Sequence, residues 1–194
     1  KAVAVWKRMP LDLGAEASGK SKARPVEARW VAEEALRLLK TYPQYSIGVI
    51  TFYTAQAKSI ENALLDCGVM YIDPTSGKME TLDDYKLTES LDSSPPRERL
   101  RVGTVDAFQG KEFDLVLLSM TRSNRLQASD ERAIRRKYGH LVLENRLCVA
   151  MSRQKRLLIV AGDDGMLSDD GGAKSVPGLA KFRDFCGGEY GAVV

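Results

Sequence analysis

The segment RVGTVDAFQGKEFDLVLLSM, residues 101–120, gives the clearest indication of the fold. Its last part, Asp114 to Met120, is a nearly continuous apolar run, which is typical of a parallel strand that is covered on both faces. Arg101 to Val105 is predicted to form another strand. The segment therefore predicts a strand, a glycine-containing loop and a buried strand.

Similar signals extend through the rest of the chain. Further strands are expected at residues 1–6, 46–52 and 156–161. Helices are expected at residues 26–39, 55–66, 141–152 and 179–185. Pro25 suits the start of the first helix. Strands that alternate with helices predict an α/β fold, with a mostly parallel sheet and helices on both of its faces.

Composition favours one well-buried domain that spans all 194 residues, of which 44% are hydrophobic. No apolar run approaches the roughly 20 residues that a membrane span requires, and the first residues resemble a strand more than a signal peptide. We therefore expect an intracellular, cytoplasmic protein with no membrane partner. Cys67, Cys148 and Cys186 are widely spaced, and His140 is the only histidine, so no metal site is expected.

Charge is distributed unevenly around a net value of +3. Residues 66–98 hold eight acidic and three basic residues, whereas residues 121–156 hold ten basic and three acidic ones. The basic segment is either a solvated face or a surface for a polyanion. Periodicity fades between residues 67 and 99, where Gly, Pro, Asp and Ser mark turns, so we expect a surface insertion there.

Four segments, in order, resemble the second RecA-like motor domain of superfamily 1 helicases. They are PVEARWVAEEALRLL from Pro25, GVITFYTAQ from Gly48, VGTVDAFQGKEFDLVLLSMTRSN from Val102 and ENRLCVAMSRQKRLLIVAGD from Glu144. The resemblance is to the branch of the nonsense-mediated-decay helicase and related DNA helicases. It covers most of the chain outside the insertion, and it implies a RecA-like, P-loop NTPase-like fold for residues 1–194.

The resemblance also implies a function. The chain would be the C-terminal motor domain of an ATP-dependent DNA or RNA helicase or translocase, of the kind that typically moves 5′ to 3′. ATP and Mg²⁺ would be held mainly by the N-terminal RecA-like domain of the same parent protein. Single-stranded nucleic acid would be the other partner, and this domain alone would be inactive as an enzyme.

The nucleotide side of the site is assigned by the same resemblance. Arg153 matches the arginine finger, a permanently charged group that compensates charge on the transferred phosphoryl group. Gly110 and Glu112 match positions that approach the nucleotide, and Arg146 is expected to assist. The structural alternatives are a surface arginine at a helix end for Arg153 and a turn glycine for Gly110.

The nucleic-acid side is assigned to five residues. Thr104 and Asp106 resemble motif V of the family, and Thr51, Tyr53 and Gln56 resemble motif IV. A threonine hydroxyl can donate to phosphate, whereas ionised Asp106 can only accept from a sugar hydroxyl or fix its loop. Tyr53 is expected either to stack on a base or to pack under the edge of the sheet.

One further motif gives a competing hypothesis. Residues 14–21, GAEASGKS, satisfy the P-loop pattern, and a self-contained NTPase would use Lys20, Ser21 and Asp163. A working P-loop needs a strand before its first glycine and a helix that begins at its lysine. Pro10 and Pro25 argue against both. A third hypothesis is a non-catalytic module that docks nucleic acid on the basic 121–156 segment.

Overall fold

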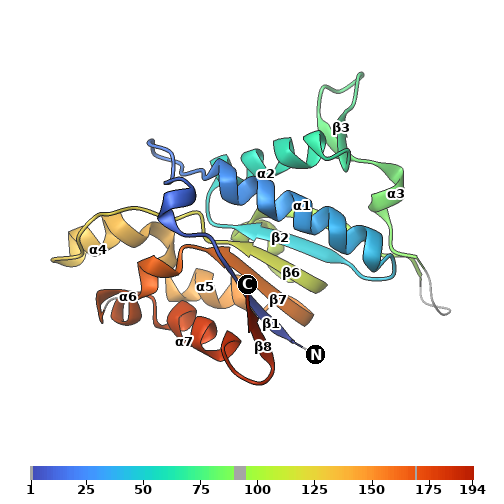
Figure 1. Ribbon diagram of the computed structural model, residues 1–194. Coiled ribbons are helices and arrows are strands. Elements are labelled where there is room, and N and C mark those ends of the chain that lie inside the picture. The colour runs from blue at the N-terminus through green and yellow to red at the C-terminus, as the bar shows by residue number, and fades with distance from the viewer. Residues whose placement is uncertain (1, 90–94, 169) are drawn as a thin grey trace.

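The computed structural model describes residues 2–89, 95–168 and 170–194. Within these residues the chain folds around a six-stranded sheet, in the order β5-β2-β6-β7-β1-β8, in which every pair is parallel (Figure 1). The strands are β1 (Ala4–Arg8), β2 (Ile47–Thr51), β5 (Leu100–Thr104), β6 (Phe113–Ser119), β7 (Gln154–Gly162) and β8 (Gly191–Val193). The predicted α/β class with a parallel sheet is confirmed.

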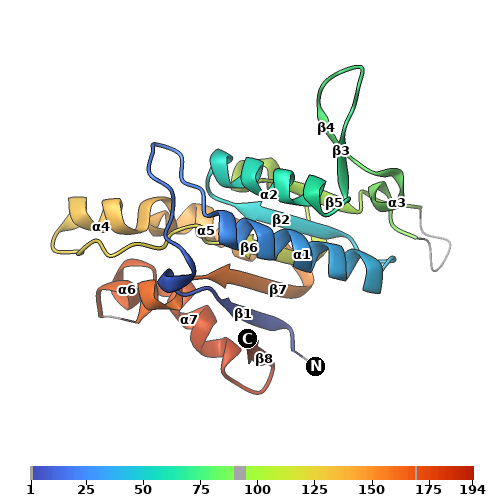
Figure 2. The ribbon, with the colours of Figure 1, turned by 45° about the horizontal axis from the view of Figure 1, so that its top comes forward.

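Helices cover both faces of this sheet (Figures 1 and 2). Helices α1 (Pro25–Thr41) and α2 (Thr54–Asp66) lie on one face, and α5 (Glu144–Met151) and α7 (Pro177–Cys186) lie on the other. All four were expected from the sequence, and α1 begins at the proline that suggested its start. Lys1, at the start of the first predicted strand, lies outside the described residues.

Two hydrophobic clusters, one on each face, explain why the central strand β6 has a continuous apolar run, Leu115 to Leu118. Val49 and Leu117 point towards α1 and α2, whereas Ile50 and Leu118, their neighbours in sequence, point towards α5 and α7. Since successive side chains of a strand alternate between faces, a strand covered on both sides needs apolar residues throughout. All seven residues of β6 are accordingly buried.

Residues 67–99, the predicted insertion, contain regular structure that the sequence did not indicate. Strands β3 (Met70–Ile72) and β4 (Met79–Thr81) form an antiparallel pair, and the short helix α3 (Asp83–Lys86) follows. The pair projects beyond the end of α2 (Figure 2). Residues 90–94 of this segment lie outside the described part of the chain.

The polar segment 122–139 also contains a helix, α4 (Glu131–Tyr138). Asp130 caps it, because its carboxylate accepts a hydrogen bond from the Ala133 backbone N–H at 2.9 Å. The remaining elements are α6 (Asp170–Ser175) and the 3₁₀ turns η1 (Leu11–Leu13), η2 (Val105–Phe108), η3 (Gly139–Val142) and η4 (Asp164–Leu167). None of the helices in the described ranges has the length and apolar character needed to cross a membrane.

Candidate nucleotide and nucleic-acid interface

The candidate residues are distributed over two opposite edges of the sheet. Thr51 and Thr104 end β2 and β5, so they lie where the parallel strands have their carboxyl ends. Glu112 directly precedes β6, and Arg153 directly precedes β7, so both lie at the amino ends of the strands. We call these the carboxyl edge and the amino edge.

The segment between β5 and β6 connects the two edges by crossing the face of β2. Gly48 of β2 makes this crossing possible, because a Cβ atom there would lie 2.9 Å from a ring carbon of Phe108 and 3.0 Å from one of Phe113. Real Cβ atoms essentially never approach so closely. The two rings pack against each other at a centroid distance of 5.4 Å. Because position 48 is glycine, the segment between β5 and β6 can pack directly against the sheet.

At the amino edge, Arg153 lies beside the loop that contains Gly110 and Glu112. Its Nε donates to the Val149 carbonyl at 3.0 Å, and its Nη1 lies 3.5 Å from the Lys111 carbonyl. The Arg153 carbonyl in turn accepts from the Phe113 backbone N–H at 2.9 Å. The guanidinium therefore lies between the end of α5 and the 110–112 loop, and it is only partly buried.

The other two amino-edge residues are open to solvent. Gly110 has a φ of +71°, and a Cβ atom there would meet nothing within 4 Å, so the glycine serves the turn and leaves room beside the backbone. The Glu112 side chain is 59% exposed and pairs with Lys155 at 3.7 Å. Arg153 and the loop that contains Gly110 and Glu112 thus lie side by side at the amino edge.

Arg146 does not join this group. Its guanidinium forms an ion pair with Asp106 and lines a hollow at the carboxyl edge, together with Thr104 and Tyr53. The reason is the length of α5, since the seven residues from Arg146 to Arg153 span about 10 Å along a helix. Arg146 thus lies away from the other residues assigned to the nucleotide, and Asp106 holds its guanidinium at the carboxyl edge.

Two candidates at the carboxyl edge are enclosed by the protein. Thr51 and Gln56 are both fully buried. The Thr51 hydroxyl lies 3.1 Å from that of Thr121, and the Gln56 amide donates to the Ser119 hydroxyl at 2.9 Å. Neither side chain reaches the surface, and both are held by internal hydrogen bonds at the ends of β2 and β6.

Sequence reasoning missed a buried ion pair that organises this edge. Glu27 accepts hydrogen bonds from the Ser119 hydroxyl at 2.5 Å and the Thr121 backbone N–H at 2.8 Å. It also pairs with Arg24 at 3.3 Å, and both side chains are completely buried. Burial raises the pKa of Glu27, and the hydrogen bonds and Arg24 oppose that rise. The sequence signal was a glutamate on the buried stripe of α1, four residues before Val31.

Tyr53 packs under the edge of the sheet and holds the η3 turn. It is 5% exposed, its hydroxyl accepts a hydrogen bond from the His140 backbone N–H at 3.1 Å, and the two rings lie 5.0 Å apart. Gly139 has a φ of +57°, and a Cβ atom there would overlap the Tyr53 hydroxyl. Of the two roles considered for Tyr53, the structure favours packing.

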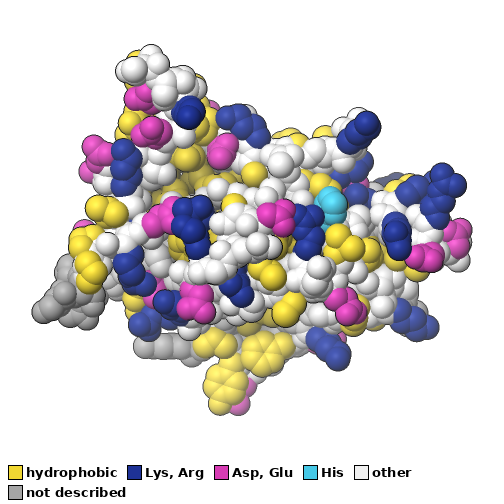
Figure 3. All heavy atoms as spheres, turned by 180° about the vertical axis from the view of Figure 1, so that it is seen from behind, with side chains coloured by type: hydrophobic (Ala, Val, Ile, Leu, Met, Phe, Trp, Pro, Cys, Tyr) yellow, Lys and Arg dark blue, Asp and Glu magenta, His cyan; other side chains and the backbone are white. Residues whose placement is uncertain are grey.

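His140 itself is half-buried next to charged groups. Burial is the main cause that lowers its pKa. The positive charges of Arg146 and Arg122 lower the pKa further, and the negative charge of Asp106 raises it. Its ring is therefore neutral at pH 7, which suits a residue packed among cations. Figure 3 shows the histidine among several Lys and Arg side chains on this face.

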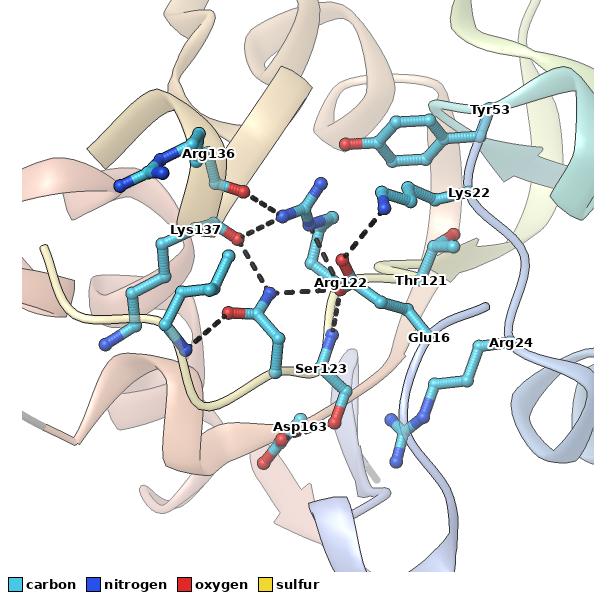
Figure 4. Close-up of polar contacts among 12 residues, drawn as sticks. Glu16, Lys22, Arg24, Tyr53, Thr121, Arg122, Ser123, Arg136, Lys137 and Asp163 are labelled. Atoms are coloured by element: carbon cyan, nitrogen blue, oxygen red, sulfur yellow. Dashed lines mark hydrogen bonds and ion pairs between the residues drawn. The ribbon is translucent and has the colours of Figure 1, made fainter. Parts of the chain in front are cut away.

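The P-loop-like segment does not have the geometry of a P-loop. No helix begins at Lys20, because α1 begins at Pro25. The Ser21 hydroxyl accepts from the Ala55 backbone N–H at 3.0 Å and so caps α2. Asp163 is buried and accepts from the Ser123 hydroxyl at 2.6 Å, beside which Figure 4 places it. Lys20 thus lacks the helix that a P-loop requires, and Ser21 and Asp163 both make hydrogen bonds within the fold.

Comparison with known proteins identifies the family of the chain. A family model described as an AAA domain matches residues 5–165, and the chain belongs to this family, the C-terminal domain of superfamily 1 helicases. The DNA polymerase alpha-associated DNA helicase A of Saccharomyces cerevisiae is 30% identical over 135 residues, which are 69% of this chain and 14% of that protein. Regulator of nonsense transcripts 1 of Caenorhabditis elegans is 29% identical over 153 residues, 78% of this chain and 11% of that protein.

A solved structure is also similar. It is the C-terminal domain of a possible DNA helicase from Lactobacillus plantarum WCFS1, with a TM-score of 0.42 and 14% identity, over 84% of this chain and 73% of that one. The chain spans less than a sixth of the length of the two sequence relatives. The predicted membership in the helicase motor-domain family is confirmed.

Proposed function

We propose that this chain is the second motor domain of an ATP-dependent helicase or translocase, which completes an ATP site with Arg153 and holds single-stranded nucleic acid at its carboxyl edge. The observation that carries the proposal is the position of Arg153 beside the 110–112 loop, where its Nη1 lies 3.5 Å from the Lys111 carbonyl. A permanently charged, partly exposed guanidinium stands there next to an open glycine turn, at an edge where another domain can dock.

The residues fit one half of a nucleotide site. Among the described residues no group of three or more carboxylates, cysteines or histidines could hold a metal ion, and no helix N-terminus cradles the P-loop-like segment. In the proposal, ATP and Mg²⁺ are held mainly by a first RecA-like domain, and Arg153 compensates charge on the transferred phosphoryl group. To do so, its guanidinium has to leave the Val149 and Lys111 carbonyls when the two domains close.

The carboxyl edge supplies the strand-binding side of the proposal. The Thr104 hydroxyl can donate to a phosphate, and Asp106 fixes Arg146, whose guanidinium then faces the same hollow. ATP would close the two domains and hydrolysis would reopen them, moving the protein along the strand, 5′ to 3′ if it follows the family. A protein that uses ATP and nucleic acid in this way would act inside the cell.

Calorimetric titration of the isolated chain with a non-hydrolysable ATP analogue and Mg²⁺ tests the half-site. The proposal predicts weak or absent binding that is unchanged in the Lys20→Ala variant. Tight binding that this variant abolishes would show a self-contained P-loop NTPase instead.

A further inference from the structure

Two hollows at the carboxyl edge lie next to each other. The first, of about 350 Å³, contains the candidate residues Thr104 and Asp106. The second, of about 400 Å³, lies over the η3 turn and the end of α4. Three residues line both hollows, namely Lys20, Tyr53 and His140. We call the combined feature the carboxyl-edge groove, and it extends the candidate strand-binding surface beyond the residues that the family motifs suggested.

The loop that brings Lys20 to this groove is firmly held on its N-terminal side. The Glu16 carboxylate accepts from the Ser123 backbone N–H at 2.7 Å and from the Asn124 amide at 3.1 Å, and it pairs with Arg122 at 3.1 Å (Figure 4). The Glu16 backbone N–H donates to the Ser123 carbonyl. These contacts fix the loop against the segment that follows β6.

The loop is equally well held on its C-terminal side. The Ser21 hydroxyl caps α2, and it also forms a hydrogen bond with the Thr54 hydroxyl at 3.1 Å. Arg24 donates from its guanidinium to the carbonyls of Gly14 and Pro10, at 2.7 and 2.8 Å. Gly19, with a φ of +129°, makes the turn just before Lys20. Lys20 therefore projects from a defined position.

Lys20 differs from the other cations of the groove in its partners. Arg146 is paired with Asp106, and Arg135 with Glu131 at 2.8 Å. Arg122 is buried and donates to the carbonyls of Arg136 and Lys137. In the part of the chain that the structure describes, Lys20 makes no ion pair, and its side chain is exposed. It can take up a phosphate without giving up an existing ion pair.

We propose that Lys20 binds a backbone phosphate of the single strand in the carboxyl-edge groove. The inference rests on the proposed function and adds a contact to the same site. The GAEASGKS segment is then a nucleic-acid element in which Gly19 turns the chain, Lys20 binds phosphate and Ser21 caps α2. A lysine suits this role, because its ammonium is a point charge that accepts any phosphate orientation.

The test measures binding of a fluorescein-labelled oligothymidylate of about 15 nucleotides to the chain, by fluorescence anisotropy at several salt concentrations. One phosphate contact on a single strand contributes about 0.7 to the slope of log K against log salt. Lys20→Ala should lower the slope by about 0.7 and weaken binding about fivefold at 0.1 M salt. Lys20→Arg should restore most of the affinity, which a merely structural role of Lys20 would not predict.

Two comparisons complete the experiment. Lys40→Ala removes an exposed lysine at the far end of α1, near the amino edge, and should leave both affinity and slope unchanged. Thr104→Ala should weaken binding whether or not Lys20 takes part. If Thr104→Ala weakens binding and Lys20→Ala does not, the Lys20 inference is wrong and the proposed function stands.

The remaining outcomes separate the two proposals further. If the unaltered chain does not bind the oligonucleotide, the strand-binding part of the proposed function fails, and the Lys20 inference fails with it. The lysine could also bind the phosphates of a nucleotide. If the chain binds the ATP analogue tightly in calorimetry and Lys20→Ala abolishes that binding, Lys20 binds nucleotide phosphates and the inference is wrong.

Discussion

Replacing Gly139 by alanine tests how the carboxyl-edge groove is built. Gly139 has a φ of +57°, and the new Cβ atom would overlap the Tyr53 hydroxyl and lie 3.0 Å from Nη1 of Arg122. The ψ of −126° at Gly139 takes it outside the left-handed helical region, into a conformation that is nearly confined to glycine and costs a residue with a side chain about 1–3 kcal/mol. Displacing the Tyr53 hydroxyl from the His140 N–H costs about 1 kcal/mol more. The free energy of unfolding should therefore fall by about 2–4 kcal/mol.

Urea denaturation followed by circular dichroism measures this loss, and Gly68→Ala is the matched control. Gly68 has a similar φ of +70°, but a Cβ atom there would meet nothing within 4 Å. This variant should therefore lose only the backbone contribution, about 1–2 kcal/mol.

A double-mutant cycle with Tyr53→Phe isolates the contact. Without the hydroxyl, the cost of Gly139→Ala should fall by about 1 kcal/mol, because the overlap with Tyr53 is gone while the backbone cost stays. The reasoning is refuted if both glycine variants lose equal stability in the unaltered chain, or if removal of the Tyr53 hydroxyl leaves the cost of Gly139→Ala unchanged.

Two further predictions concern buried and half-buried charge. Glu27→Ala leaves the fully buried Arg24 guanidinium without its ion-pair partner. The free energy of unfolding, measured by urea denaturation, should fall by about 3–5 kcal/mol. A loss below about 1 kcal/mol would show that the pair does not stabilise the fold. For His140, the pKa is lowered in the folded state, so the unfolded chain takes up the proton first as pH falls. Its contribution to stability should be present above pH 6.5 and lost as pH falls through the folded-state pKa, and His140→Gln should remove this dependence. Because the chain has one histidine, NMR titration of its ring checks the pKa directly, and a value at or above 6.5 would contradict the prediction.

The core of the fold was predictable because its signals are local. β6 has an unbroken apolar run from Leu115 to Leu118, and α1 and α2 carry apolar stripes at helical spacing. Helix α4 was not predicted because its sequence, ERAIRRKY, is mostly charged and buries few apolar side chains. The Asp130 cap was a usable signal that the polar composition of the segment concealed.

The candidate site was predictable only in part, because motifs give positions along the chain and not the direction of side chains. The placement of Arg153 beside the 110–112 loop agrees with the prediction. Arg146 lies at the opposite edge, because α5 carries it about 10 Å from Arg153. Thr51 and Gln56 turn inwards, because the ends of β2 and β6 are joined by a buried polar network that includes Glu27. Such a network depends on residues more than 60 positions apart.

The most direct test of the account is steady-state ATP turnover of the longer parent protein, with saturating single strand, after Arg153→Ala. Arg29→Ala is a matched control, because Arg29 is an exposed arginine of α1, on the face of the sheet opposite α5. The account predicts that Arg153→Ala lowers kcat on the order of a thousandfold while strand affinity is largely kept, and that Arg29→Ala remains near the unaltered protein. Near-normal turnover in Arg153→Ala would contradict the assignment of Arg153 to a shared ATP site.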